Sequence, residues 1–390
     1  MFALLGILLG VFMGLVPGVH PNMIILLVPL LVSLDIGPLS LVAMITAMGV
    51  TNSVVDFIPS ILLGAPEGGS ELSVLPGHKL LLGGFGYDAV KLTVIGSIGS
   101  LLVVLLLLPV MALAIPMLFD FARPVIYLFL LFIVLLMILT EGGEGKIYAA
   151  LLFLASGTIG LQLDRFPVDS TLALFPVFSG FFGISMLVLQ TRSRTKIAKQ
   201  RFSRIAIGSR LRNRSILLGS LGGIFSGFLP GVGSSEVATL ATVDKNDKSF
   251  LVTLGALTTA NIIFSILTLW LISRPRSGVA VAISQVAEIG LPEVLVIIAV
   301  CMLSVGVGSI VTLRLAGVFV IRLEKINYTA VSRLVIAAVV GLVFFFTGFF
   351  GLLLLVTATA LGILASMLGV KRGNLMGILI LPTMLFYAGL

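Results

Sequence analysis

The sequence predicts an all-α integral membrane protein with about ten transmembrane helices, arranged as two inverted-topology repeats of five with broken or re-entrant segments. The chain of 390 residues is 59% hydrophobic and only 10% charged, whereas soluble domains carry about 25% charged residues. Apolar runs such as Leu101–Phe119 and Val125–Leu139 can cross a hydrocarbon core that takes roughly 20 residues to span. One long segment also occurs twice, which predicts the repeats.

The basic charge of the chain is concentrated in one segment. Thr191–Arg214 contains nine of the 24 Lys and Arg residues and no acidic residue, which leaves 15 basic against 16 acidic residues elsewhere. Cytoplasmic loops of membrane proteins carry such an excess of Lys and Arg. We therefore expect this segment to be cytoplasmic, with anionic lipid headgroups as further contacts, and we expect no nucleic-acid partner.

Few residues in the chain are suited to metal binding or catalysis. Cys301 is the single cysteine, so the sequence holds no disulfide and no thiolate metal site. His20 and His78 lack the spacing of a catalytic zinc site. An intramembrane enzyme would also need a base–nucleophile set or paired aspartates, and neither is visible. We expect no enzyme activity, no resident metal and no cofactor. The apolar start lacks a basic n-region, which argues against a cleaved signal peptide.

The duplication is clearest at the start of each half. At an offset of 213 positions, Leu4–Val19 matches Leu217–Val232 with ten identities in sixteen. Both copies carry three glycines four residues apart and then a Pro-Gly pair. Glycines at this spacing leave a smooth stripe on one helix face, where another backbone can approach closely. The glycines are Gly6, Gly10 and Gly14 in the first copy and Gly219, Gly223 and Gly227 in the second.

The match continues more weakly at an offset of 209, where Asn52 aligns with Asn261 and Pro66 with Pro275. We therefore divide the chain into a first repeat at 1–190, a basic linker at 191–214 and a second repeat at 215–390.

Each repeat is expected to open with a broken helical pair. In the first repeat the pair covers Phe2–Val16 and Asn22–Ser33, a span covers Leu39–Leu63, an interrupted segment covers Ala65–Gly84, and further spans cover Ala89–Phe119, Ala122–Leu139, Ile147–Gly160 and Leu172–Leu189. In the second repeat the pair covers Ile216–Leu229 and Ser234–Thr242, and spans cover Phe250–Ile272, Pro292–Ile321, Ala330–Phe346, Phe350–Leu368 and Leu375–Ala388. The interrupted segment lacks the phosphate-loop pattern GxxxxGK and is expected to be re-entrant or interfacial.

Five crossings per repeat is an odd number, so the second repeat starts on the opposite side of the membrane and the two repeats are inverted. We expect the protein in the plasma membrane. If 191–214 lies in the cytoplasm, five crossings place the N-terminus outside the cell. The segments around Lys79, at 141–146, at 244–248 and at 371–372 then lie inside. Arg274 and Arg276 are the exception to the charge rule, because this topology places them outside.

The two Pro-Gly pairs are expected to break their helices. Irregular backbone at membrane depth is tolerated only inside protein or beside water. A restarted helix directs free N–H groups and a partial positive charge at what precedes it, which suits a carboxylate or phosphate. Inverted repeats with such breaks are typical of secondary transporters; a packing kink is the competing interpretation. The candidate anion-binding residues are Pro17, Gly18, His20, Asn22, Pro230, Gly231, Gly233, Ser234 and Ser235.

A polar face on Leu39–Leu63 adds further candidates. Asn52, Asp56 and Ser60 are spaced four residues apart and share one helix face. An intramembrane carboxylate marks a functional pathway by default, so Asp56 is a candidate coupling residue for Na⁺ or H⁺; a hydrated position near the inner interface is the alternative. Glu236 is a second coupling candidate, or complements a helix dipole. Asn261, Thr258 and Thr259 lie on the corresponding span of the second repeat. They either line the same solute cavity as Asn52 or form hydrogen bonds between helices.

At these residues the sequence resembles the large membrane subunit of the tripartite tricarboxylate transporter permeases, and it is most similar to their shorter, archaeal-type branch. The resemblance rests on GxxxGLxPGxHxN at Gly10–Asn22, on DFIPSILLGAP at Asp56–Pro66, on Leu72–Ser97 and on GxxPGxG around Pro230. It implies a permease for carboxylates such as citrate, with a small membrane subunit and an extracytoplasmic binding protein as partners.

We therefore expect a secondary active transporter for an anionic solute, a di- or tricarboxylate. A polyprenyl-phosphate lipid-carrier translocase is the alternative, because a phosphate headgroup suits two helix N-termini equally well and some of those families have similar paired breaks. A homodimer is among the assemblies that the sequence leaves open.

Overall fold

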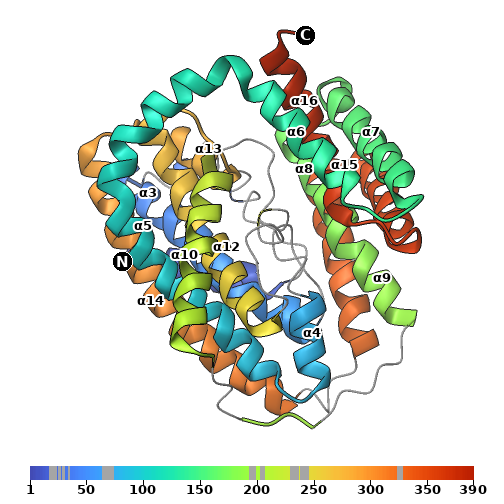
Figure 1. Cartoon of the computed structure of the whole chain (residues 1–390), viewed down its shortest axis with the longest axis horizontal. Helices are drawn as coiled ribbons and strands as arrows, with labels where there is room; N and C mark the ends of the chain where they lie inside the picture. The colour runs from blue at the N-terminus through green and yellow to red at the C-terminus, as the bar shows by residue number, and fades with distance from the viewer. Residues whose placement is uncertain are drawn as a thin grey trace.

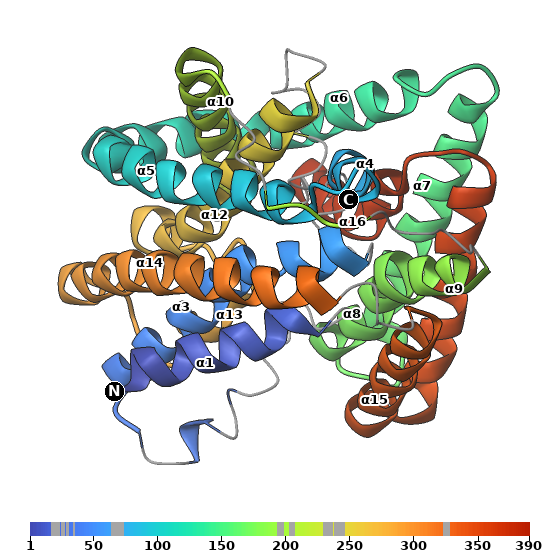
Figure 2. The ribbon, with the colours of Figure 1, turned by 90° about the horizontal axis from the view of Figure 1, so that it is seen from below.

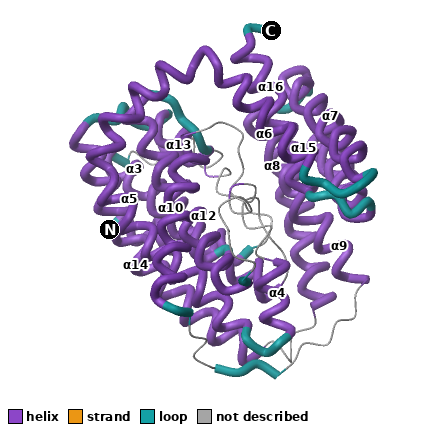
Figure 3. Tube along the Cα trace, in the orientation of Figure 1, coloured by secondary structure: helices purple, strands orange, loops and turns teal. Residues whose placement is uncertain are grey.

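The structure is a computed structural model of the chain. It describes residues 1–16, 24, 28, 31–33, 36–63, 74–192, 199–202, 207–228, 237, 246–322 and 328–390. Within these ranges the chain is helical and contains no strand, as Figure 3 shows. The predicted all-α class is confirmed.

The first half of the chain carries eight described α-helices and two π-helical segments. They are α1 (Phe2–Leu15), α3 (Pro38–Val55), the π-helix η2 (Pro59–Leu63), α4 (Val74–Leu82), α5 (Gly86–Ala122), α6 (Ile126–Leu139), α7 (Gly145–Gln162), α8 (Ser170–Phe178), the π-helix η6 (Ser179–Ile184) and α9 (Ser185–Arg192), and the described part of the second half begins with α10 (Ser209–Phe228). It continues with α12 (Asp247–Ile272), α13 (Gly278–Ser284), α14 (Leu291–Arg322), α15 (Tyr328–Met367) and α16 (Gly377–Ala388).

Seven helical stretches among the described residues are long and apolar enough to cross a membrane. Two of them exceed a single crossing, since Gly86–Leu139 has 54 residues, or about 80 Å at 1.5 Å per residue. This stretch divides at a short 3₁₀ turn, η4 (Arg123–Val125). The stretch Thr329–Met367 divides at Gly348, whose φ of 63° and ψ of −157° are not helical. That glycine lies in the predicted gap between the spans 330–346 and 350–368. The count of ten crossings remains a prediction.

The C-terminal end of the expected basic linker is helical. We expected the linker to cover 191–214, but α10 begins at Ser209 and contains Arg210, Arg212 and Arg214. Leu and Arg are good helix formers, and arginine side chains at a membrane helix end can extend to the headgroups, so the helix continues through the end of the basic segment.

The helices form two groups, which we call the first and the second lobe (Figure 1). The first lobe contains α1, α3, α4, α5, α10, α12, α13 and α14, and the second lobe contains α7, α8, α9, α15 and α16, with α6 packed against α7 and α16. Each lobe therefore draws helices from both halves of the chain, so the halves are interwoven. Figure 2 shows α1, α3 and α14 stacked beside one another in the first lobe.

In the first lobe, helices from the first half of the chain pack against helices from the second half in two corresponding pairs. Helix α3 packs against α14, and α12 packs against α5. The second contact is very close, because a Cβ at Gly255 would lie 2.1 Å from the Thr93 carbonyl oxygen and one at Gly96 would lie 2.1 Å from that of Val252. Ser97 Oγ also donates a hydrogen bond to the Gly255 carbonyl at 3.3 Å. Close approach through glycine is how membrane helices gain van der Waals contact.

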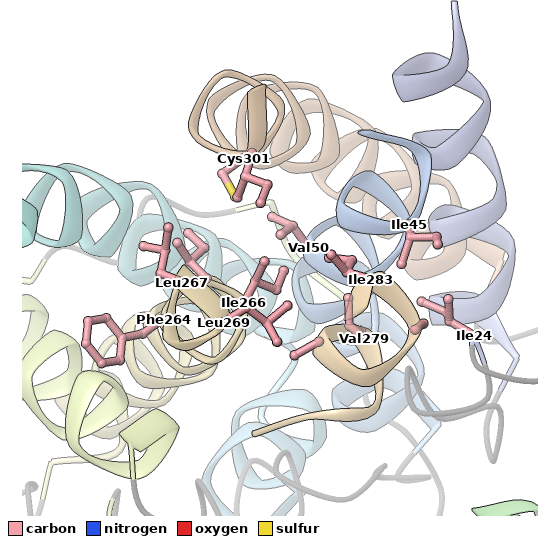
Figure 4. Packing of buried hydrophobic residues seen from close by; sticks show 14 of the residues in the cluster. Ile24, Ile45, Val50, Phe264, Ile266, Leu267, Leu269, Val279, Ile283 and Cys301 are labelled. Atoms are coloured by element: carbon pink, nitrogen blue, oxygen red, sulfur yellow. The ribbon is translucent and has the colours of Figure 1, made fainter. Parts of the chain in front are cut away.

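Helix α13 lies between α3 and α12 in the core of the first lobe (Figure 4). Val279 and Ile283 of α13 are fully buried among residues of both neighbours. The glycine at position 49 of α3 makes room for this helix, because a Cβ there would lie 2.7 Å from Val279 Cγ2.

Contacts between connecting segments agree with the relative placement expected from charge. Lys79 Nζ lies 2.8 Å from Asp247 Oδ2, and Gln200 Nε2 of the basic linker donates to the Leu81 carbonyl at 2.9 Å. All three segments were expected on the inner face, and here they meet. Which face is cytoplasmic remains a prediction.

The second lobe gives a similar pairing. The backbone N–H of Lys371 donates to Glu141 Oε1 at 3.0 Å, which joins two further segments expected inside. At the other end of the spans, the Arg276 guanidinium carbon lies 5.3 Å from the centroid of the Phe119 ring. Arg276 was expected outside.

Candidate functional site

Helices α1 and α10 precede the two Pro-Gly pairs in the sequence. Helix α1 ends at Leu15, followed by Val16 with an extended backbone (φ −96°, ψ 103°). Helix α10, as described, ends at Phe228. The end of α1 lies two residues before Pro17, and α10 is described up to two residues before Pro230. The predicted anion-binding residues Pro17, Gly18, His20, Asn22, Pro230, Gly231, Gly233, Ser234 and Ser235, and the coupling candidate Glu236, lie outside the described residues.

The glycine stripe of α1 is pressed against the backbone of α3. A Cβ at Gly6 would lie 2.3 Å from the Met44 carbonyl oxygen, and one at Gly10 would lie 2.6 Å from that of Met48. No side chain fits at such distances. The first stripe therefore fixes α1 along α3 at backbone contact.

The stripe of α10 makes the same contacts with α12. A Cβ at Gly219 would lie 2.4 Å from the Thr253 carbonyl oxygen, and one at Gly223 would lie 2.4 Å from that of Leu257. The glycines are offset by 213 positions from those of α1, and their partners by 209 from those on α3. These are the two offsets at which the sequence matches itself, so the repeated sequence makes a repeated helix pair.

The last glycine of each stripe lies beside one predicted site residue, an asparagine. A Cβ at Gly14 would lie 3.2 Å from the Asn52 carbonyl oxygen, and one at Gly227 would lie 3.1 Å from that of Asn261. Both glycines precede their proline by three residues. Asn52 is fully buried, and among the described residues neither its Oδ1 nor its Nδ2 has a hydrogen-bond partner. Asn261 is partly buried. The structure thus places each asparagine at the end of the helix that leads into a break.

Asp56 lies one turn beyond Asn52, at the end of α3. It is only 5% exposed, and its Oδ1 has no hydrogen-bond partner among the residues described. Ser60 Oγ donates to the Asp56 backbone carbonyl at 2.8 Å. The helix changes from α to π at Pro59, as expected where proline lacks the N–H that would bond to the fourth carbonyl before it. A buried carboxylate at an irregular turn is a candidate site for a proton or a hydrated cation.

The second repeat has a serine at the equivalent position. Ser265 follows Asn261 by four residues, and its hydroxyl is hydrogen-bonded to that of Ser277 at 2.9 Å. Ser277 caps α13, because its Oγ accepts from the Ala280 N–H at 3.2 Å. Position 56 and its counterpart 265 therefore differ in charge, so the two repeats are not chemically equivalent.

The two threonines predicted beside Asn261 behave differently. Thr258 Oγ1 donates to the Leu254 carbonyl of its own helix at 3.0 Å. Thr259 Oγ1 is buried and has no partner within the part of the chain that the structure describes. Thr259 thus remains a candidate for the polar lining, whereas Thr258 is satisfied within α12.

The interrupted segment is partly helical. Its described part forms α4, in which a Cβ at Gly77 would lie 2.8 Å from Ile61 Cγ1 of the π-helix η2. His78 is partly buried there, and burial lowers the pKa of its imidazole below the usual 6.5. The glycine places α4 against the π-helical turn that follows Asp56.

One charged residue near the second repeat's site was not predicted to belong to it. Arg276 precedes the cap residue Ser277, and its Nε and Nη2 are buried with no hydrogen-bond partner among the described residues. The only signal in the sequence was its exceptional position in the charge pattern. Among the described residues, no group of three or more His, Cys, Asp or Glu side chains is placed to hold a metal ion.

Comparison with known proteins gives one family. The model of the tripartite tricarboxylate transporter TctA family matches residues 1–377. An uncharacterized protein of Methanocaldococcus jannaschii is 27% identical over 351 residues, which cover 87% of this chain and 86% of that protein. No solved structure matches the chain.

Proposed function

Since the chain belongs to the tripartite tricarboxylate transporter TctA family and is a multi-pass membrane transporter, we propose that it is a secondary active permease for a di- or tricarboxylate. The anionic part of the solute binds between the two Pro-Gly breaks, at Pro17–Asn22 and Pro230–Glu236. Backbone N–H groups at the restarted helices supply most of the affinity, with the positive ends of the helix dipoles.

One observation carries this proposal. Two helices are held against their neighbours by the same glycine contacts in the same register, and each precedes a Pro-Gly pair in the sequence. A repeated sequence that served only for packing would have no reason to repeat the break and the polar residues after it. The reciprocal packing of α3 with α14 and α12 with α5 supports a pseudo-twofold relation between the repeats, which would bring the two breaks to one solute.

The polar residues beside the breaks complete the proposed site. Asn52 and Asn261 line the cavity at the ends of α1 and α10, and Ser60 continues the polar face of Asn52. Asp56 carries the coupling ion, Na⁺ or H⁺, and Glu236 assists it. The support for Asp56 is its burial and its unpartnered Oδ1 among the described residues, since an ionised carboxylate without a partner is costly in a membrane.

The partners follow from the family. A tripartite system implies a small membrane subunit and an extracytoplasmic binding protein. We propose that both act with this chain, the binding protein on the outer face, where the N-terminus lies, and the basic linker on the cytoplasmic face.

The proposal is tested by thermal-shift measurements on the purified chain with succinate, citrate and a short polyprenyl phosphate, in Na⁺ and in K⁺ and at two pH values. A ligand at 100 times its Kd adds about 2.7 kcal/mol to the free energy of unfolding. Stabilisation by carboxylates, enhanced by Na⁺ or by low pH, supports the permease. Stabilisation by the polyprenyl phosphate alone would support the lipid-carrier alternative instead.

A further inference from the structure

Arg276 lies in the short connection between α12 and α13, at the end of the spans where α5 finishes. Helix α12 ends at Ser273 in the left-handed conformation (φ 52°), and Ser277 caps α13. Arg274, two residues before Arg276, is exposed. Arg276 instead is directed inward, and its guanidinium carbon lies 5.3 Å from the centroid of the Phe119 ring of α5.

One edge of this guanidinium lacks an acceptor. Nε and Nη2 are both buried, and neither has a hydrogen-bond partner among the described residues. The N–H bonds of these two atoms are parallel, and together they form the fork that binds the two oxygens of a carboxylate. Burying a cation without a partner is unfavourable. Within the described ranges one salt bridge is present, between Lys79 and Asp247, and it does not involve Arg276. No described carboxylate therefore pairs with this fork.

The fork lies close to α10, the helix that precedes the second Pro-Gly pair in the sequence. The hydroxyl of Ser277, the next residue, is hydrogen-bonded to that of Ser265 at 2.9 Å. A Cβ at Gly227, three residues before Pro230, would lie 3.3 Å from the Ser265 backbone nitrogen. Through the adjacent residue Ser277, these two contacts link Arg276 to the last described turn of α10.

The two repeats differ in charge at this position. At the offset of 209 that aligns Pro66 with Pro275, Arg276 aligns with Glu67. In inverted repeats these positions lie on opposite faces of the membrane. Arg276 is then a cation on the outer side, against the usual bias of Lys and Arg toward the cytoplasm. A role in binding an anion that arrives from outside explains why an arginine is found there.

We infer that Arg276 binds the transported anion, with its Nε and Nη2 edge receiving one carboxylate of the solute on the outer side of the second break. This inference rests on the proposed function and adds a cationic side chain to a site built from backbone N–H groups and polar side chains. The bidentate edge favours a planar carboxylate, and the Phe119 ring holds the guanidinium in place. Solutes with two or three carboxylates can then engage the fork and a helix N-terminus together.

The test compares Arg276→Gln and Arg276→Lys with Arg274→Gln, which removes the same charge from an exposed neighbour. Binding of citrate, succinate and acetate to the purified full-length chain is measured, together with the Tm of each unliganded protein. Loss of a charged hydrogen-bonded pair corresponds to roughly a 10- to 100-fold weaker Kd. We expect this for Arg276→Gln with citrate, a partial recovery with Arg276→Lys, and a change of less than about twofold for Arg274→Gln.

The unliganded Tm separates binding from a structural role. Removing an unpaired buried charge should leave the Tm of Arg276→Gln unchanged or higher. A lower Tm with an unaltered citrate Kd would make Arg276 a structural residue and overturn the inference. Citrate binding by the wild type and by Arg276→Gln with equal Kd also overturns it, while leaving the permease function intact. A wild type that binds neither a carboxylate nor a polyprenyl phosphate contradicts both proposals. If the wild type binds only the polyprenyl phosphate, and Arg276→Gln abolishes that binding, then Arg276 still binds an oxyanion but the carboxylate substrate is refuted.

Discussion

Replacing Gly223 by alanine should separate α10 from α12 and move the second break. A Cβ at this position would lie 2.4 Å from the Leu257 carbonyl oxygen and 2.5 Å from Ala260 Cβ. Ordinary contact begins at 3.4 Å, so the two helices must move apart by about 1 Å. Neither obstacle can rotate away, because one is backbone and the other is a methyl group. Overpacking of this kind costs typically 1–3 kcal/mol.

The assay is thermal unfolding of the purified chain, followed by citrate uptake in proteoliposomes. We expect Gly223→Ala to lower Tm by a few degrees and to reduce uptake, because the displaced helix carries the break with it. The matched control is Gly306→Ala in α14, where a Cβ would meet nothing within 4 Å. That substitution should leave Tm equal or slightly higher, since alanine is the better helix former by roughly 0.5–1 kcal/mol. Normal Tm and normal uptake in Gly223→Ala would refute the assigned helix contact.

Three further predictions concern coupling, pH and topology. Asp56→Asn should abolish accumulation of solute against a gradient while citrate binding stays within about threefold, whereas the exposed Asp120→Asn should behave as wild type; normal accumulation by Asp56→Asn would remove Asp56 from the coupling role. Because burial lowers the pKa of His78, the unfolded state binds the proton more readily, so stability should fall as the pH drops below about 6.5; wild type and His78→Gln with equal Tm-versus-pH slopes between pH 7 and 5.5 would contradict this. On a Cys301→Ala background, single cysteines at 163–168 should react with an external impermeant maleimide and those at 199–202 should not; equal labelling at both places would sink the proposed orientation.

Local features of the fold could be predicted from the sequence. The end of α1 before Pro17 and the break in α15 at Gly348 follow from the conformational properties of proline and glycine. The limits of α12 and α14 follow from apolar runs with polar ends. Each of these features depends on a few neighbouring residues, so one sequence contains the whole signal.

Relations between distant segments could not be predicted in the same way. The glycine stripes indicated close packing with a backbone, but nothing in the sequence identified α3 and α12 as the partners. The interweaving of the halves depends on contacts such as that of Gly255 with Thr93, which lie far apart in the chain. Arg276 illustrates the same limit for the site, since its unpaired fork depends on Phe119 and on the Ser265–Ser277 hydrogen bond, neither of which the charge pattern reveals.

The central claim is that one anion lies between the two Pro-Gly breaks. The most direct measurement is an experimental structure of the chain with bound citrate. We predict that a carboxylate lies within hydrogen-bonding distance of backbone N–H groups at 17–22 and at 230–236. An anion lying more than one helical turn from both breaks would contradict the account.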